Sequence, residues 1–123
     1  MNILISNSSN KPIYEQIKEQ IKALIIRGDI DQGESLPSIR NLAKELQISV
    51  ITTKRAYEEL EREGFIETVP GKGSFVSAQN KEILKERKMK MIEEKLQDVV
   101  DESIAMDISL EEIIEVLKVL YNN

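Results

Sequence analysis

The sequence of 123 residues contains no cysteine, no histidine and no tryptophan. Without cysteine the chain has no disulfide, no thiolate nucleophile and no sulfur ligand for a metal, and without histidine it has no imidazole general base. Carboxylates occur in pairs, but they fall on helices that we expect to be exposed, and no glycine-rich phosphate loop accompanies them. The sequence therefore predicts that the chain is not an enzyme and that it uses no cofactor and no metal ion.

Long apolar runs are also missing, because no stretch approaches the roughly 20 residues that span a bilayer. The first six residues are too few for a signal peptide and lack a basic start. We therefore expect a cytoplasmic protein without a membrane-bound segment, and the absence of cysteine fits that compartment. The length predicts one small domain with an appendage, whose core must be aliphatic because aromatic residues make up only 4% of the chain.

Charge is distributed unevenly along the chain, although the net charge of −5 alone would argue weakly against a nucleic-acid partner. Residues 1–80 hold 10 basic and 11 acidic residues, whereas residues 81–123 hold 7 basic and 11 acidic residues. All five glycines and all three prolines precede residue 74. The sequence thus divides near residue 80 into a nearly neutral part with turns and an acidic part that reads as uninterrupted helix.

Apolar residues recur at helical spacing in three segments of the first part. The first segment begins at Pro12 and stops at Gly28, and the second begins after Ser38, which we expect to cap it. A break at residues 47–49 separates the second segment from a third, which runs over residues 50–63 and ends at Gly64. Ser49 is the expected cap of this third helix.

Alternating residues then predict a β-hairpin, with strands over residues 65–69 and 74–77 joined by a tight turn at residues 70–73. A lone hairpin is marginal in water, so we expect it to pack on the helices. The remainder predicts a long helix to about Met106 and a last helix that starts at Ser109, which can form a capping box with Glu112.

Two short helices joined by a tight turn and followed by a hairpin predict a winged helix-turn-helix, in which the third helix enters the major groove of DNA. Basic residues occupy the start of this third helix and acidic residues its end. Lys72 adds a positive charge at the tip of the hairpin between two glycines. A helix that points its N-terminal end at phosphates is expected to have this polarity.

Three blocks of sequence resemble the GntR family of bacterial transcription regulators: LPSIRNLAKEL at residues 36–46, KRAYEELEREGFI at 54–66 and GKGSFV at 71–76. The start of the first helix, PIYEQI at residues 12–17, and the short two-helix tail are similar to the YtrA-like subfamily. This resemblance implies a mainly α fold with a small β wing, a winged helix-turn-helix over residues 9–78 and a dimerisation tail over residues 80–122.

The resemblance also implies which residues face DNA: Arg40, Ser49, Val50, Thr52, Lys54, Gly71 and Lys72. Val50 stands where many members have a base-reading arginine, so that base contact is missing here. Thr53 stands where an apolar core residue is usual. Lys54 and Arg55 cannot share one helix face. We expect Lys54 to meet DNA and Arg55 to pair with Glu58 or Glu59.

An apolar seam in the tail cannot bury itself within one chain, so we expect a homodimer. The interface is predicted to contain Met89, Ile92, Leu96, Val99, Ile113, Leu117 and Leu120. The resulting hypothesis is a transcriptional regulator that binds double-stranded DNA at an inverted-repeat operator. We favour a repressor, and the sequence leaves open an activator. A winged helix that contacts proteins instead of DNA is the alternative, and the sequence leaves open whether a small-molecule effector binds.

Overall fold

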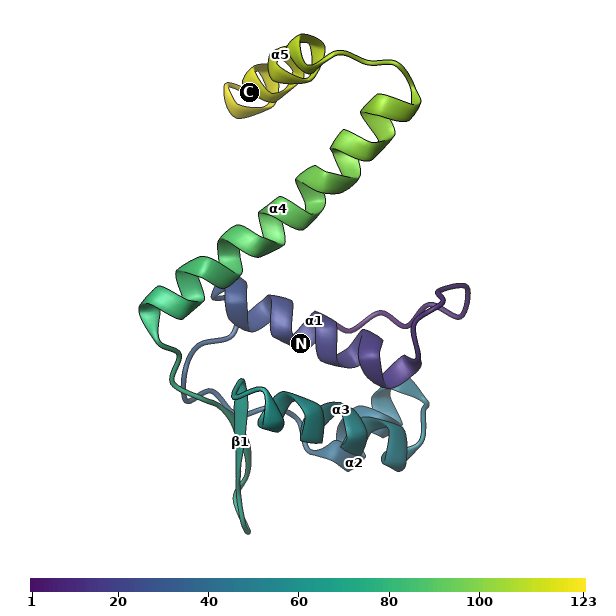
Figure 1. Cartoon of the computed structure of the whole chain (residues 1–123). Helices are drawn as coiled ribbons and strands as arrows, with labels where there is room; N and C mark the ends of the chain where they lie inside the picture. The colour runs from purple at the N-terminus through teal and green to yellow at the C-terminus, as the bar shows by residue number, and fades with distance from the viewer. The chain divides into compact units, whose positions relative to one another are not determined.

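Short helices and a small hairpin form the first part of the chain, and two further helices form the second (Figure 1). The structure is a computed structural model that describes residues 1–123 and divides into two compact units, residues 1–84 and 85–123. The order is α1 (Ile13–Arg27), α2 (Ile39–Leu46), α3 (Val50–Arg62), β1 (Ile66–Val69), β2 (Gly73–Val76), α4 (Lys81–Ala105) and α5 (Leu110–Tyr121). The predicted class, mainly helical with a two-stranded wing, is confirmed.

The ends of the helices are set by capping residues that can be identified in the sequence. The side chains of Ser38, Ser49 and Ser109 each accept a hydrogen bond from the backbone amide three residues later. Helix α1 stops at Gly28, whose φ of 82° is left-handed, and the next amide returns to the carbonyl of Leu24 at 2.9 Å. These caps explain why the helix boundaries were predictable.

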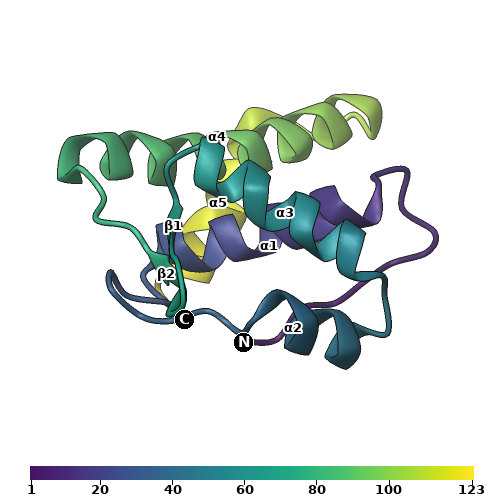
Figure 2. The same cartoon turned by 90° about the horizontal axis from the view of Figure 1, so that it is seen from below.

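Helices α1 and α2 both pack on α3, which is therefore the centre of the first unit (Figures 1 and 2). The core is aliphatic, as predicted, with Phe65 and Tyr57 as its aromatic members. Its fully buried side chains come from all of these helices and from the start of the hairpin, namely Ile17, Ile21, Leu42, Thr53, Leu60, Phe65 and Ile66. Such burial fixes the direction of α3 relative to its two neighbours.

Strands β1 and β2 pair antiparallel, with Ile66 opposite Val76 and Val69 opposite Gly73. The end of β1 is as predicted, and the other three strand ends differ by one residue. The hairpin has a further partner that the sequence pattern did not indicate. Residues 33–36 run beside β2, where the amides of Gly33 and Leu36 each donate at 2.9 Å to its backbone carbonyls. This added pairing fastens the base of the wing to the segment before α2.

The N-terminal segment is held on α1 by two glutamines. The side-chain amide of Gln20 donates to the carbonyl of Leu4 and accepts from its N–H, and Gln16 forms the same pair of bonds with Ser6. Gln16 and Gln20 are four helical residues apart, a rise of about 6 Å, and Leu4 and Ser6 are two extended residues apart, about 6.8 Å. The two distances nearly match, so both glutamines can bond to the segment at once. The side-chain amides of the two glutamines thus satisfy the backbone groups of Leu4 and Ser6, as a neighbouring β-strand would.

A charged cluster joins α1 to the end of α3. The carboxylate of Glu63 lies 2.8 Å from the Nζ of Lys22 and 3.3 Å from the Nζ of Lys18. Burial by itself would raise the pKa of Glu63, but the hydrogen bonds and charges of the two lysines outweigh it and lower that pKa.

The second unit contains most of α4 and all of α5, joined by a bend at Asp107 with a left-handed φ of 58° (Figure 1). The bend separates the two helices, which do not pack extensively on each other. As predicted, Ser109 caps α5 and accepts from the amide of Glu112 at 3.2 Å. None of the helices combines the length and the hydropathy that crossing a membrane requires.

Candidate nucleic-acid interface

The turn between α2 and α3 is three residues long, and its conformation sets the angle between the two helices. Gln47 adopts a left-handed φ of 56°, and the amide of Ile48 bonds back to the carbonyl of Ala43 at 3.0 Å. Ser49 then starts α3. The hydroxyl of Tyr57, in the middle of α3, reaches back to the backbone just before α2. These contacts fix the start of α3 relative to α2.

Ser49 and Thr52, both predicted to face DNA, are bonded to each other. The Oγ of Ser49 accepts from the amide of Thr52 at 3.0 Å and lies 2.8 Å from the Thr52 hydroxyl, to which it donates. Thr53 is completely buried, and its hydroxyl donates to the carbonyl of Ser49 at 3.1 Å. A threonine therefore fits a core position here, because its methyl group packs and its hydroxyl is satisfied.

The two adjacent cations of α3 have different surroundings. The Nζ of Lys54 lies 3.9 Å from the carboxylate of Glu58, and both side chains are exposed. The guanidinium of Arg55 instead lies over the ring of Tyr14, 3.8 Å from its centroid. The expectation that Arg55 pairs with a glutamate was wrong, because the start of α1 offers it an aromatic face. An exposed pair such as Lys54–Glu58 is weak enough for a phosphate to compete with Glu58.

The remaining predicted side chains are exposed on α2 and on the wing. Arg40 lies in the first turn of α2, and Lys72 lies at the tip of the hairpin, where its amide closes the turn on Val69 at 2.9 Å. Gly71 and Gly73 both have positive φ, at 77° and 111°, so the tight turn itself requires glycine. The wing tip is therefore a narrow loop with one positive side chain.

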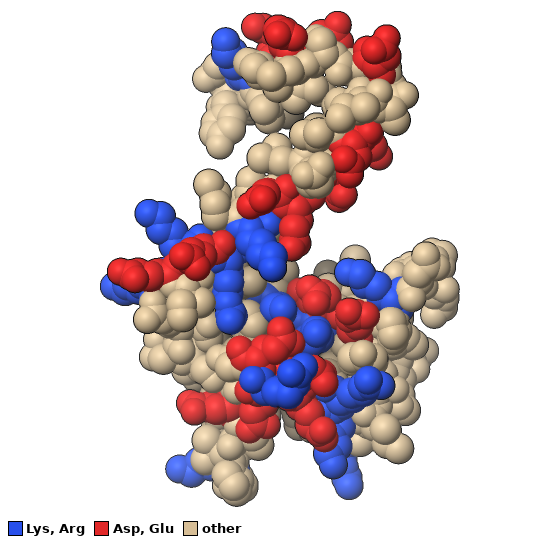
Figure 3. All heavy atoms as spheres, viewed as in Figure 1, with Lys and Arg blue, Asp and Glu red and all other residues tan.

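Charge separates on the surface of the first unit, as Figure 3 shows. Blue side chains project from its lower edge, at the wing tip and around the start of α3, whereas red side chains gather over the later part of α3. The sequence order explains this pattern, because the bases of residues 40–55 precede the acids of residues 58–67. The lower edge is thus the cationic border of a unit that is nearly neutral only as a whole.

Ile51 belongs to this edge and was not predicted. It is 81% exposed at the second position of α3, and the neighbouring Val50 is 47% exposed. The signal for it was present, because helical spacing places residue 51 opposite the buried Thr53, Ala56 and Tyr57.

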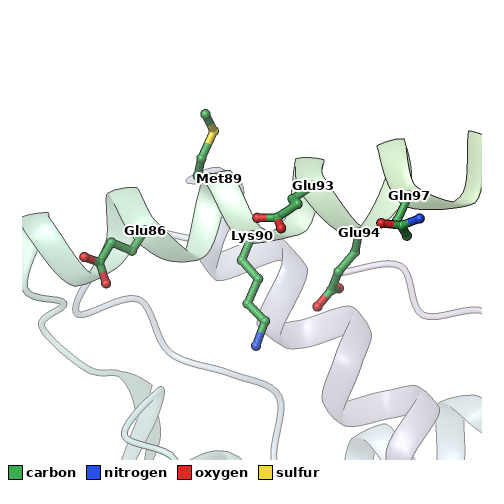
Figure 4. A pocket seen from close by; sticks show the side chains of 6 residues that line it. All are labelled: Glu86, Met89, Lys90, Glu93, Glu94 and Gln97. Carbon is green, nitrogen blue, oxygen red and sulfur yellow. The ribbon is translucent and has the colours of Figure 1, made fainter. Parts of the chain in front are cut away.

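The apolar residues predicted for the dimer seam remain largely uncovered in the single chain. Ile113 is half-buried, and the others are exposed: Met89, Ile92, Leu96, Val99, Leu117 and Leu120. A shallow hollow runs along α4, and Figure 4 shows six of its lining side chains, Glu86, Met89, Lys90, Glu93, Glu94 and Gln97. All six belong to one helix, so they enclose no binding site.

Comparison with known proteins gives consistent matches. The family model for bacterial regulatory proteins of the gntR family matches residues 13–76. The chain is 41% identical to the HTH-type transcriptional repressor YtrA of Bacillus subtilis, covering 94% of this chain and 89% of that protein. A GntR family transcriptional regulator from Listeria monocytogenes has a similar structure, with a TM-score of 0.77, 32% identity and coverage of 93% and 97% of the two chains. The DNA-binding domain of AraR, solved with its operator ORX1, matches with a TM-score of 0.56 and 28% identity over 63% of this chain and 96% of that one.

Proposed function

Because the chain belongs to the gntR family of bacterial regulatory proteins, we propose that it is a repressor that binds an inverted-repeat operator as a homodimer. As a member of this family it is a DNA-binding transcriptional regulator and not an enzyme. Residues 9–78 form the DNA-binding domain, and residues 80–122 form the dimerisation tail. Repression is supported by the similarity to YtrA, which is described as a transcriptional repressor. The protein acts in the cytoplasm, where bacterial promoters lie.

The observation that carries this proposal is the cationic lower edge of the first unit, with the start of α3 and the wing tip on it (Figure 3). The start of α3 enters the major groove, where Lys54 leaves its weak pair with Glu58 and meets a phosphate. Arg40 and Lys72 contact phosphates on either side, and the glycine turn at Gly71 lets the wing backbone approach closely. The acidic end of α3 stays away from DNA.

Ser49 and Thr52 contribute through the cap that they form. Their mutual hydrogen bonds hold the first turn of α3 in one conformation before DNA arrives. The hydroxyls have lone pairs left for a water-mediated contact, and the unpaired amides of the first helical turn favour an anion. Val50 lies at the same end, without the polar group of an arginine.

Dimerisation is supported by the uncovered apolar residues of α4 and α5. Isolated helices with exposed leucines, isoleucines and valines are unfavourable in water, and a second copy of the same seam would cover them. A two-fold axis through paired tails would present two recognition helices to successive major grooves, about 34 Å apart. An inverted repeat with half-sites one helical turn apart, or a multiple of it, is the operator that fits.

Footprinting on the promoter DNA beside the gene tests the proposal directly, because it gives the operator, its symmetry and the spacing of its half-sites. We expect Lys54→Glu to weaken binding to that operator at least tenfold and to reduce the salt dependence by about one phosphate contact. Lys81→Glu, the same charge change at the start of α4, is the matched control and should bind like the unaltered protein. Absence of any salt-dependent DNA binding would instead favour the protein-contacting alternative.

A further inference from the structure

Two large apolar side chains protrude from the first turn of α3. Ile51 is 81% exposed and Val50 is 47% exposed, whereas Ala56, Tyr57 and Leu60 of the same helix are buried. Ile51 is therefore largely open to solvent, and Val50 is about half open. Exposed apolar surface of this kind costs free energy in the isolated protein, so its position on the molecule is informative.

Val50 and Ile51 lie at the N-terminal end of α3, which is part of the cationic lower edge. Ile51 precedes Lys54 by three residues, so it lies about one helical turn before that lysine. The cap formed by Ser49 fixes the backbone of this turn. A polyanion that meets Lys54 therefore brings its own surface against Val50 and Ile51.

Base edges in the major groove are polar with one exception. Guanine, adenine and cytosine present hydrogen-bonding groups, whereas thymine also presents its C5-methyl group. Valine and isoleucine side chains can neither donate nor accept a hydrogen bond, so they cannot read a guanine as an arginine does. A methyl group is the one feature of a base edge that they complement.

We propose that Val50 and Ile51 contact thymine methyl groups, so that each operator half-site carries an A·T pair beneath the start of α3. The contact determines part of the sequence specificity. This inference rests on the proposed operator binding and identifies which base that binding selects.

Replacement of single thymines by deoxyuridine tests the inference, because it removes the C5-methyl group and leaves the hydrogen-bonding groups unchanged. With the footprinted operator and fluorescence anisotropy, we expect deoxyuridine at the contacted thymine to weaken binding about fourfold per half-site, the ratio for one buried carbon group. The same change in both half-sites should weaken it roughly fifteenfold. Deoxyuridine in the spacer between the half-sites should have no effect.

Protein variants connect the methyl group to these residues. Ile51→Ala should reduce the preference for thymine over deoxyuridine, because Val50 remains as a partner of the methyl group. The double variant with Val50→Ala should bind the two operators nearly equally, since both proposed partners are then removed. Leu4→Ala removes a side chain that is 72% exposed elsewhere in the first unit, so it should keep the full preference for thymine.

The outcomes separate this inference from the function on which it rests. An operator that is bound equally well with deoxyuridine at every half-site thymine, or whose half-sites lack A·T pairs, would overturn the methyl contact and leave operator binding intact. A preference for thymine that survives in the double variant would also overturn it. Failure to bind any promoter DNA would overturn both.

Discussion

The hydroxyl of Tyr57 donates a hydrogen bond of 2.7 Å to the backbone carbonyl of Pro37. The bond links the middle of α3 to the residue before the cap of α2, across 20 positions of sequence. Because the ring of Tyr57 is buried, this bond has little water to compete with it, and it helps to fix the crossing of the two helices.

Removal of this hydroxyl should destabilise the first unit. Tyr57→Phe keeps the ring but leaves the carbonyl of Pro37 without its partner, so we expect the free energy of unfolding to fall by about 1 kcal/mol. Urea denaturation followed by circular dichroism measures the change. Tyr14→Phe is the control, because the ring of Tyr14 under Arg55 remains and stability should be unchanged.

The same residue predicts a loss of stability at alkaline pH. Burial raises the pKa of Tyr57 above its ordinary value of 10.0. Its contribution is therefore complete below pH 10 and declines as the pH rises toward the folded-state pKa. The stability difference between the wild-type chain and Tyr57→Phe should change across this range, and equal pH profiles for both proteins would contradict the assignment.

Glu63 predicts the opposite sensitivity, at acid pH. Its pKa is lowered from 4.5 because Lys22 and Lys18 outweigh the effect of burial, so its stabilising effect is complete above pH 4.5 and is lost as the pH falls through the folded-state pKa. Glu63→Gln should lower the free energy of unfolding at neutral pH by about 1 kcal/mol, since the cluster is partly exposed. Thermal melts at pH 7 and pH 3 measure this effect. The decrease in stability on acidification should be smaller for Glu63→Gln than for the wild-type chain. Glu61→Gln, at an exposed position of the same helix, should follow the wild-type profile.

The glutamine pair on α1 makes a prediction for hydrogen exchange. Gln20→Ala removes the acceptor of the Leu4 amide, which should then exchange nearly as fast as in an unstructured peptide. The amide of Ser6, bonded to Gln16, should keep more of its protection, and the helical amides of α1 should not change. Glu15→Ala is the control and should leave exchange of the Leu4 amide unchanged. Slow exchange of that amide in Gln20→Ala would show that the side-chain bond is not what protects it.

The seam on α4 predicts the oligomeric state. Leu96→Asp places a charge in the middle of the apolar residues that we assign to the dimer, so we expect the dimer dissociation constant to rise by at least tenfold. Sedimentation equilibrium measures the constant, and circular dichroism checks that helix content is kept. Gln97→Glu adds one negative charge at the next position and should leave the dimer intact. An unaffected Leu96→Asp dimer would place the interface elsewhere.

Local sequence determined the elements of this protein and the side chains that bound them. The helix starts were predicted from the capping residues Ser38, Ser49 and Ser109, and the helix ends from Gly28 and Gly64. Such predictions succeed because caps depend on residues only a few positions apart. The winged helix-turn-helix followed from the order of these elements. The cationic start of α3 was likewise readable, since it lies within one short segment.

Tertiary structure alone decided what depends on residues far apart. No local pattern pairs Gln16 and Gln20 with the N-terminal segment, adds residues 33–36 to the wing, or gives Arg55 the ring of Tyr14 in place of a neighbouring glutamate. Exposure is also a property of the fold, so the periodicity of α3 indicated where Ile51 lies, but only packing showed that nothing covers it. Sequence periodicity specifies which faces a helix has, and the neighbours that each face meets are chosen by the packing of the whole unit.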